Sequence, residues 1–301
     1  MALSNSFSLH FCLLLILPLI SHGFVNLNAR NVLHLETSQL LQTARQSCRS
    51  QLKLSANDIA WNQVKVLENK KAAEGLKSIV LDVGDIEKSY TNPGQYVQLR
   101  PDASGKPGFY AIANAPAKAV SKGAFEFLIK ETEGNTWLTG AEDGAALEMT
   151  GAMGKGYAIQ ENFLGYKYDW PCINILLFAC GSGIAPVRAA IENGLTVMKG
   201  SPLMKQCRLY YGVKTPDHLA YKDKFEAWAA DGVEIVPVVS RPEGTGWTGR
   251  TGYIQDALKA DGVDIPRNSG AIMCGHKEMV ESVKETMAEA GSFEGRFLLN
   301  F

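Results

Sequence analysis

The sequence lacks a strong charge of either sign and has no long apolar run in its body. Its 30 Lys and Arg residues nearly balance 31 Asp and Glu, which leaves a formal net charge of −1. The basic residues are scattered, so no electrostatic argument favours nucleic acid as a partner. Beyond the N-terminus no segment approaches the ~20 apolar residues that a membrane-spanning helix needs. The 301 residues therefore predict a globular protein of two domains behind a leader, with no membrane span in the mature chain.

Cysteine is too sparse and too widely spaced for a metal cluster. Two of the six cysteines fall in the N-terminal leader, and the others are Cys172, Cys180, Cys207 and Cys274. No two of these four form the Cys-x-x-Cys spacing typical of iron–sulfur clusters and structural zinc sites. We therefore expect no metal site, and free thiols in a reducing compartment.

The N-terminus has the composition of a targeting sequence. An apolar core from Phe11 to Ile20 precedes Ser21-His22-Gly23, a small-x-small pattern that predicts a signal peptide over 1–23. Residues 24–57 contain a single acidic residue, Glu36, and several arginines, which is typical of an organelle transit peptide. This two-part arrangement resembles the presequences of algae with secondary plastids and predicts a plastid protein. A secreted protein with a disordered N-terminus is the alternative.

The first half of the mature chain consists of short β-prone runs separated by Gly, Pro, Asn and Asp clusters. The runs are 61–67, 76–83, 96–99, 109–113, 124–129 and 146–150. Six strands at this spacing predict a small antiparallel barrel or a sandwich. A short helix is expected near 134–138.

The second half alternates strands with helices, which predicts a parallel sheet covered on both faces. Strands are expected at 173–179, 207–213, 233–239 and 270–274, and helices at 186–199, 217–230, 252–260 and 277–290. Ligands bind at the carboxyl ends of the strands in such sheets. Glycine, polar or thiol residues stand at those ends, namely Gly181, Gly212, Ser240-Arg241 and Cys274-Gly275.

The first strand–helix turn of this half carries a glycine motif. The apolar run over 173–179 leads into Gly181-Ser182-Gly183, and Pro186 follows in the first turn of the expected helix. Such glycines allow a phosphate to approach the backbone closely, and the free N–H groups of a helix start attract anions. The third glycine of the dinucleotide fingerprint is missing, so a nucleotide-binding turn and a plain glycine-rich turn both fit this motif.

The order of the two halves and their motifs together resemble the ferredoxin–NADP⁺ reductase family. The resemblance rests on Gly181 to Pro186, on Ser240-Arg241, on Cys274 to Met279, and on the terminal aromatic residue Phe301. Within the family, the segments 109–113 and 211–221 resemble the plant fruit-protein reductase-like branch. The resemblance implies an FAD-binding β-barrel over 58–168 and an NAD(P)-binding α/β domain over 169–301.

The flavin motif of that family, Arg-x-Tyr-Ser/Thr, is incomplete here. The matching residues are Gly108-Phe109-Tyr110-Ala111, so the Arg for the flavin diphosphate and the hydroxyl for flavin N5 are absent. The Tyr110 ring can still pack on the flavin, since that contact needs only an aromatic face. Backbone amides at Gly134-Asn135-Thr136, the Thr136 hydroxyl, or Lys118 are the candidates for the diphosphate. Loss of one charge-assisted contact weakens binding by ~1.5–3 kcal/mol.

The resemblance assigns roles to Cys274 and to the terminal residue Phe301. Cys274 would lie beside the nicotinamide, next to Gly275 and Met279, whereas spacing alone favours a buried structural cysteine at the end of a strand. Phe301 would cover the flavin, so that nicotinamide must displace it before hydride can pass. A packed edge strand over 297–299 is the alternative for that segment.

The coenzyme preference depends on positive charges. Ser240, Arg241 and Lys214 stand at neighbouring strand ends, and an Arg can bind a 2′-phosphate with its rigid fork. We therefore expect NADP. NAD stays possible because Glu243, which would suit a free ribose, lies close by.

The residues and the resemblance together predict a flavin-dependent oxidoreductase. It would transfer hydride between NAD(P)H and FAD, with Cys274, Tyr110 and Phe301 at the reacting rings, and pass electrons to an unidentified small redox protein or small molecule. A non-catalytic flavin- or nucleotide-binding protein with a degenerate flavin site is the main alternative. An electron-transfer subunit is a third, although such relatives often carry a C-terminal cysteine cluster that is missing here.

Overall fold

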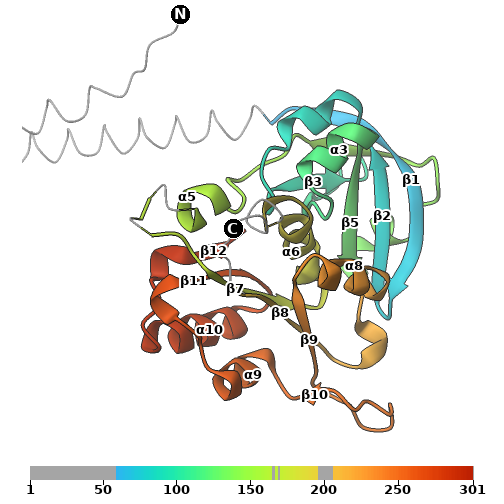
Figure 1. Cartoon of the computed structure of the whole chain (residues 1–301). Coiled ribbons are helices and arrows are strands. Elements are labelled where there is room, and N and C mark those ends of the chain that lie inside the picture. The colour runs from blue at the N-terminus through green and yellow to red at the C-terminus, as the bar shows by residue number, and fades with distance from the viewer. Residues whose placement is uncertain (1–58, 165–166, 169, 196–205, 301) are drawn as a thin grey trace, which may run out of the picture. The chain divides into compact units, whose positions relative to one another are not determined.

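The computed structural model describes residues 59–164, 167–168, 170–195 and 206–300. The predictions for 1–57 and for Phe301 lie outside these residues. The described chain contains two six-stranded sheets, one antiparallel and one parallel (Figure 1). No described helix combines the length and the apolarity that crossing a membrane requires. The predicted combination of an antiparallel barrel with a parallel-sheet α/β domain is confirmed.

The antiparallel sheet contains all six strands that the sequence predicts. They are β1 (Trp61–Ala73), β2 (Leu76–Asp82), β3 (Tyr96–Arg100), β4 (Gly108–Ala111), β5 (Ala124–Lys130) and β6 (Ala146–Thr150), in the order β4-β3-β6-β1-β2-β5. The two outer strands meet, because the backbone N–H of Ala113 donates to the carbonyl oxygen of Glu126 at 2.8 Å. This contact closes the sheet into a barrel.

Strand β5 shows why the barrel and the α/β domain pack together. Phe125, Phe127 and Ile129 alternate along the strand and point into the barrel core. Leu128 faces the other way and joins an apolar cluster that contains Ile184 of the α/β domain. One strand therefore contributes to two cores.

The parallel sheet consists of β7 (Asn174–Cys180), β8 (Gln206–Val213), β9 (Glu234–Val239), β10 (Arg250–Thr251), β11 (Ser269–Cys274) and β12 (Phe297–Leu299). Its order is β10-β9-β8-β7-β11-β12. Helices α6 (Ile184–Ala190) and α8 (Phe225–Ala230) cover one face, and α9 (Ile254–Asp261) and α10 (Lys277–Glu289) cover the other. The central strand β7 is buried on both faces, as its apolar run predicts.

Several helices differ from the prediction. The helix expected over 186–199 is α6, followed by a π-helical turn at Ile191–Leu195. The helix expected over 217–230 is interrupted, because Tyr221 adopts a left-handed backbone with φ +59° and divides it into two 3-10 turns and α8. The 3-10 turns of that segment are Pro216–His218 and Lys222–Lys224.

Short helices also connect the barrel strands. They are a 3-10 helix at Gly84–Ser89, α3 (Pro116–Lys122), and a 3-10 turn at Glu133–Asn135 with α4 (Thr136–Thr139). Helix α5 (Ile159–Phe163) lies between the last barrel strand, β6, and β7 of the parallel sheet. The turn and α4 lie where a short helix is expected. Helix α3 carries standard boundary residues, Pro116 in its first turn and Gly123 in the left-handed conformation at its end.

Candidate functional site

A cavity of about 630 Å³ lies where the barrel meets the α/β domain. This volume falls within the range typical of cofactor pockets. Its walls come from β3, β4, β5 and the turn before α4 on the barrel side, and from the carboxyl ends of β7, β11 and β12 on the other. The lining residues include Tyr96, Phe109, Tyr110, Ala111, Lys130, Asn135, Ser182, Gly183, Pro186, Cys274, Gly275, His276 and Asn300.

Strand β4 supplies the aromatic part of the barrel wall. Tyr110 is partly buried, and Phe109 is 66 % exposed with its ring edge-on to Tyr96 at a centroid distance of 5.7 Å. The Tyr110 phenol lies back over Gly108, where a Cβ atom would come within 2.7 Å of the hydroxyl oxygen. The position that would carry the family's Arg is therefore occupied by the tyrosine side chain.

The end of β5 brings a cation to the same wall. Lys130 lines the cavity, and its carbonyl oxygen accepts a hydrogen bond from Asn135 Nδ2 at 2.8 Å. Asn135 Oδ1 accepts from the backbone N–H of Thr132 at 2.9 Å, which fixes the turn. Gly134 and Thr136 lie in this turn without lining the cavity in the described structure, and the Thr136 hydroxyl donates to the carbonyl oxygen of Glu133.

The glycine turn between β7 and α6 forms the facing wall. Gly181 has φ +53°, a conformation that side chains other than glycine rarely adopt. A Cβ atom on Gly183 would overlap the carbonyl oxygen of Cys274. Ser182, Gly183 and Pro186 line the cavity, so the motif lets the turn approach the end of β11 closely.

The end of β11 holds the candidate nicotinamide residues. Cys274 and Gly275 line the cavity, and Met279 packs its methyl group into the space that a Cβ atom on Gly275 would need. Burial raises the pKa of the Cys274 thiol to about 12, and the nearby Cys180 adds to this effect. The thiol is therefore neutral at physiological pH and suits packing or hydrogen bonding rather than nucleophilic attack.

Asn300 is a lining residue that sequence reasoning missed. Strand β12 runs parallel to β11 with Leu299 opposite Met273, which places Asn300 next to the end of β11. Its side-chain Oδ1 is buried and has no hydrogen-bond partner among the described residues. A ligand N–H group in the cavity would satisfy it. The predicted role of the neighbouring Phe301 lies outside the described residues.

Three predicted coenzyme residues gather at a second location. The backbone N–H of Arg241 donates to the carbonyl oxygen of Lys214 at 2.8 Å, and that of Ser240 donates to Val213 at 3.0 Å. Both cationic side chains are exposed. These residues lie at the carboxyl ends of β8 and β9, the same sheet edge as the cavity, although they are not part of its described lining.

Lys118, a candidate cation for the diphosphate, pairs with a carboxylate of the α/β domain. Its Nζ lies 2.9 Å from Glu192 Oε2 on the α/β domain, and it is not among the described lining residues. Lys130 is the barrel cation that lines the cavity instead. Its position at a strand end before the Gly134 turn is the sequence signal that could have indicated it.

Comparison with known proteins gives consistent matches. A family model described as an oxidoreductase NAD-binding domain matches residues 177–285. The fruit protein pKIWI502 of Actinidia deliciosa is 32% identical over 239 residues, which cover 76% of this chain and 73% of that protein. The ferredoxin–NADP reductase of Thermosynechococcus vestitus is 28% identical over 266 residues, which cover 77% of this chain and 66% of that protein.

A solved structure shares the fold. A ferredoxin NADP⁺ reductase from Neisseria gonorrhoeae with bound FAD and NADP superposes with a TM-score of 0.64 at 18% identity, covering 79% of this chain and 97% of that one. The sequence match to the Actinidia protein extends over about three quarters of both chains. The chain belongs to the ferredoxin–NADP⁺ reductase-type family of FAD- and NAD(P)-binding oxidoreductases.

Proposed function

We propose that this chain is an NAD(P)H-dependent flavoprotein oxidoreductase whose barrel holds FAD and whose α/β domain holds the nicotinamide nucleotide. The observation that carries the proposal is the single cavity lined by Tyr110 of the barrel and by Gly183 and Cys274 of the α/β domain. FAD, when bound, supplies the hydride-accepting ring and passes the electrons to an acceptor. The acceptor is a small redox protein or a small molecule.

The residues of the cavity fit such a group. Tyr110 offers an aromatic face, and Lys130, at the end of β5 beside the Asn135 turn, offers a cation for a diphosphate. The buried Asn300 Oδ1 offers an acceptor to a ring N–H or to a carboxamide. With Gly at 108 and Ala at 111, the chain holds the flavin by stacking and through Lys130 rather than through an Arg and a hydroxyl.

The glycine turn and Cys274 bind and orient the nucleotide. Backbone amides of Gly181-Ser182-Gly183 would hold its diphosphate, and the close approach of Gly183 to Cys274 brings the turn and the thiol to one wall. Because the thiol is neutral, Cys274 packs against the nicotinamide without contributing charge. Hydride transfer to a flavin needs no side-chain proton donor, so His276, which lines the cavity at the start of α10, is assigned no part in proton transfer.

NADPH is the proposed coenzyme. Arg241 and Lys214 present two cations at neighbouring strand ends, which suits the doubly charged 2′-phosphate. The exposed Glu243 lies two positions from Arg241 and makes NADH the second candidate.

The proposed location is the plastid, reached by the signal peptide over 1–23 and the transit-like segment over 24–57. The support is compositional, namely the apolar core over 11–20 followed by a segment poor in acidic residues. Secretion is the alternative. Fusion of residues 1–57 to a fluorescent protein in an alga with secondary plastids distinguishes plastid import from release into the medium.

A second candidate function is flavin or nucleotide binding without turnover. It is favoured by the absence of a charged side chain at Gly108 and of a hydroxyl at Ala111. The decisive experiment is the absorbance of the purified protein, followed by anaerobic titration with NADH and NADPH in parallel. Yellow protein that bleaches with either nucleotide supports the oxidoreductase. Colourless protein that does not change after added FAD and NADPH contradicts it.

A further inference from the structure

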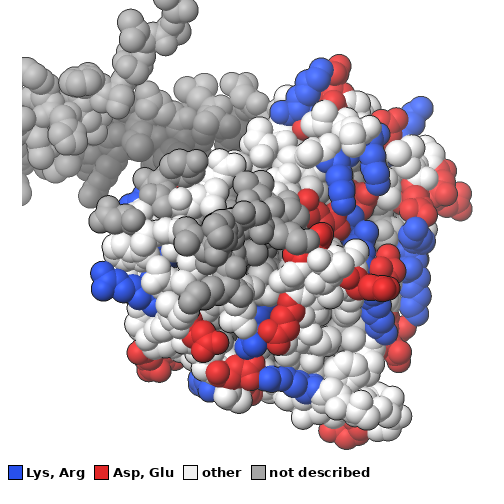
Figure 2. Space-filling view, viewed as in Figure 1, with Lys and Arg blue, Asp and Glu red and all other residues white. Residues whose placement is uncertain are grey.

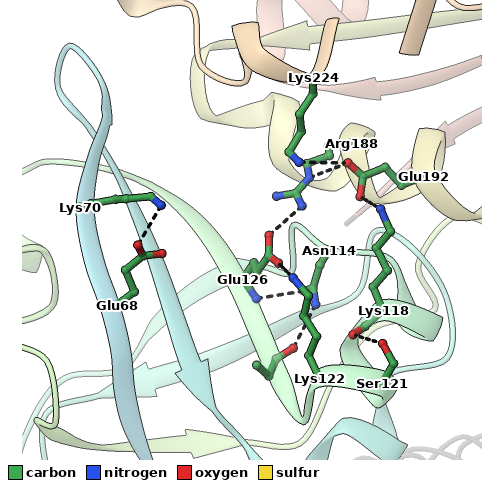
Figure 3. Close-up of polar contacts among 11 residues, drawn as sticks. Glu68, Lys70, Asn114, Lys118, Ser121, Lys122, Glu126, Arg188, Glu192 and Lys224 are labelled. Atoms are coloured by element: carbon green, nitrogen blue, oxygen red, sulfur yellow. Dashed lines mark hydrogen bonds and ion pairs between the residues drawn. The ribbon is translucent and has the colours of Figure 1, made fainter. Parts of the chain in front are cut away.

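A buried ion-pair network joins the barrel to the α/β domain (Figure 3). Arg188 on α6 points its guanidinium between two carboxylates. Its Nη2 lies 2.7 Å from Glu126 Oε2 on β5, and its Nε lies 3.0 Å from Glu192 Oε1 one helical turn further along the same segment. Only 4% of the Arg188 side chain is exposed, so this contact is part of the domain interface.

Lysines extend the network within the barrel and across the interface, and on the face drawn in Figure 2 blue Lys and Arg side chains alternate with red Asp and Glu side chains. Lys122 Nζ lies 3.0 Å from Glu126 Oε1 within the barrel, whereas Lys118 of the barrel reaches Glu192 of the α/β domain at 2.9 Å. The two domains are thus linked through Arg188–Glu126 and again through Lys118–Glu192, as Figure 3 shows.

Both carboxylates are charged at neutral pH. Burial acts to raise the pKa of Glu126 and of Glu192, but Arg188 and the lysines together outweigh it and lower both values. Charge-assisted hydrogen bonds of this buried kind are stronger and more directional than exposed ones. Removal of one partner would leave an uncompensated buried charge.

Further contacts hold Glu126 and Arg188 in place. The backbone N–H of Glu126 donates to Asn114 Oδ1 at 2.9 Å, which ties β5 to the segment that follows β4. The Arg188 guanidinium carbon lies 4.8 Å from the centre of the Tyr221 ring. Tyr221 has the left-handed backbone with φ +59°, a strained conformation that persists only where its surroundings impose it.

The network lies beside both walls of the cavity. On β5, Glu126 precedes the lining residues Leu128 to Lys130, and on α6, Arg188 follows the lining residue Pro186. A contact between Glu126 and Arg188 therefore sets the separation of the two walls within a few residues of where they face the ligands.

We propose that Arg188 is a positioning residue that, by pairing with Glu126, holds the α/β domain in the orientation that brings nicotinamide and flavin together. The inference rests on the proposed oxidoreductase function. It assigns no new chemistry to Arg188, which is not among the described lining residues of the cavity. Its role is to fix the distance over which hydride passes.

The test compares Glu126→Gln, Arg188→Gln and Arg188→Lys with the control Lys70→Met. Lys70 pairs with Glu68 at 2.8 Å on the exposed barrel surface and is also drawn in Figure 3. Anaerobic stopped-flow measurement of flavin bleaching by NADPH gives a limiting rate and an apparent dissociation constant. Flavin content and amide exchange of the α6 and β5 segments are measured on the same preparations.

For Glu126→Gln we expect a limiting rate at least about tenfold lower, which corresponds to about 1.4 kcal/mol. The flavin content should be unchanged, and the dissociation constant for NADPH should stay within about twofold of the wild-type value. Amide exchange in α6 should be faster. Arg188→Lys keeps part of the rate that Arg188→Gln loses, because a lysine can still pair with Glu126. Lys70→Met matches the wild type in every measurement. A wild-type limiting rate in Glu126→Gln, or a rate loss explained by lost flavin, overturns the proposal.

Failure of the proposed function has a different signature. If neither NADPH nor NADH bleaches the wild type, the oxidoreductase assignment fails. Amide exchange then decides on the interface alone: faster exchange of α6 in Glu126→Gln than in Lys70→Met supports domain positioning by Arg188, and equal exchange overturns it.

Discussion

Gly183 and Cys274 lie so close that no side chain fits between them. A Cβ atom on Gly183 would overlap the carbonyl oxygen of Cys274 and come within 3.3 Å of its sulfur. The two residues end neighbouring features of the parallel sheet, the turn after β7 and the end of β11. This close approach places the proposed diphosphate site and the proposed nicotinamide site on one wall.

The substitution Gly183→Ala tests this approach. The added methyl must push the turn away from β11, and overpacking of this kind costs about 1–3 kcal/mol. We expect a lower unfolding midpoint and an NADPH affinity reduced by about tenfold or more, measured by thermal unfolding and by titration.

The matched control for this substitution is Gly151→Ala. Gly151 does not line the described cavity, and a Cβ atom there would meet Ser89 Oγ at 3.5 Å, an ordinary contact. Its unfolding midpoint and NADPH affinity should match the wild type. If Gly183→Ala behaves like this control, the turn is more adaptable than the geometry indicates.

Lys130 is expected to bind the flavin diphosphate in place of the family's Arg. Lys130→Met removes the cation but keeps the apolar stem, so flavin affinity should fall by about 1.5–3 kcal/mol, or roughly 10–100-fold. Lys77→Met on the neighbouring strand β2 provides the control. Fluorescence titration of the apoprotein with FAD measures both, and equal affinities for the two variants would assign the diphosphate to another group.

Local sequence patterns predict many of the strands and helices of the fold. The β-prone runs between turn residues predict the six barrel strands and the buried strand β7, and most of their bounds agree with the structure to within two residues. Strand β1 is the exception, because it extends to Ala73. Helix α3 was missed, although Pro116 and Gly123 mark its ends. The sequence of Phe297–Leu299 does not distinguish the edge strand β12 from a flavin-covering tail, because three residues carry too little periodicity.

The sequence predicts fewer of the site residues, because the site depends on contacts between segments that are distant in the chain. Motifs indicate Tyr110 and Cys274, and both residues line the cavity. Asn300 becomes visible only when β12 is paired with β11, and Arg188 acquires its role only when α6 packs against Glu126. The helix expected over 217–230 is interrupted at Tyr221, which has a left-handed backbone conformation. This conformation follows from the packing of Tyr221 rather than from its residue type.

Arg241 should decide between the two coenzymes. Arg241→Gln removes the fork that suits the 2′-phosphate, so the ratio of kcat/KM for NADPH to that for NADH should fall by about tenfold or more. The NADH value itself should change little. Lys259→Gln, an exposed site on α9, is the control and should leave the ratio unchanged. An unaltered ratio in Arg241→Gln would remove Arg241 from coenzyme selection.

The interface network predicts a specific sensitivity to acid. The pKa values of Glu126 and Glu192 are lowered in the folded state, so their contribution to stability is present above the ordinary carboxyl pKa of about 4.3 and is lost as pH falls through the lower folded values. Between pH 6 and pH 3 the wild type should therefore lose more unfolding free energy than Glu126→Gln. Denaturant unfolding at several pH values measures this, with Glu68→Gln as the exposed control. Parallel curves for wild type and Glu126→Gln would contradict the stabilising role of the pair.

The buried thiols predict slow alkylation at moderate pH. Burial raises the pKa of Cys172 and Cys180 to about 11, and that of Cys207 and Cys274 to about 12. An unperturbed thiol ionises near pH 8.5, so at pH 8 these four should react with iodoacetamide at least about 100-fold more slowly than in guanidinium. Above pH 8.5 the unfolded chain ionises first, and stability should fall as pH rises toward 11. Peptide mass spectrometry follows each cysteine, and Cys180, which is partly exposed, should react first. Rapid alkylation of Cys274 at pH 8 would mean that its thiol is accessible and ionised, against the buried, neutral thiol assigned to it here.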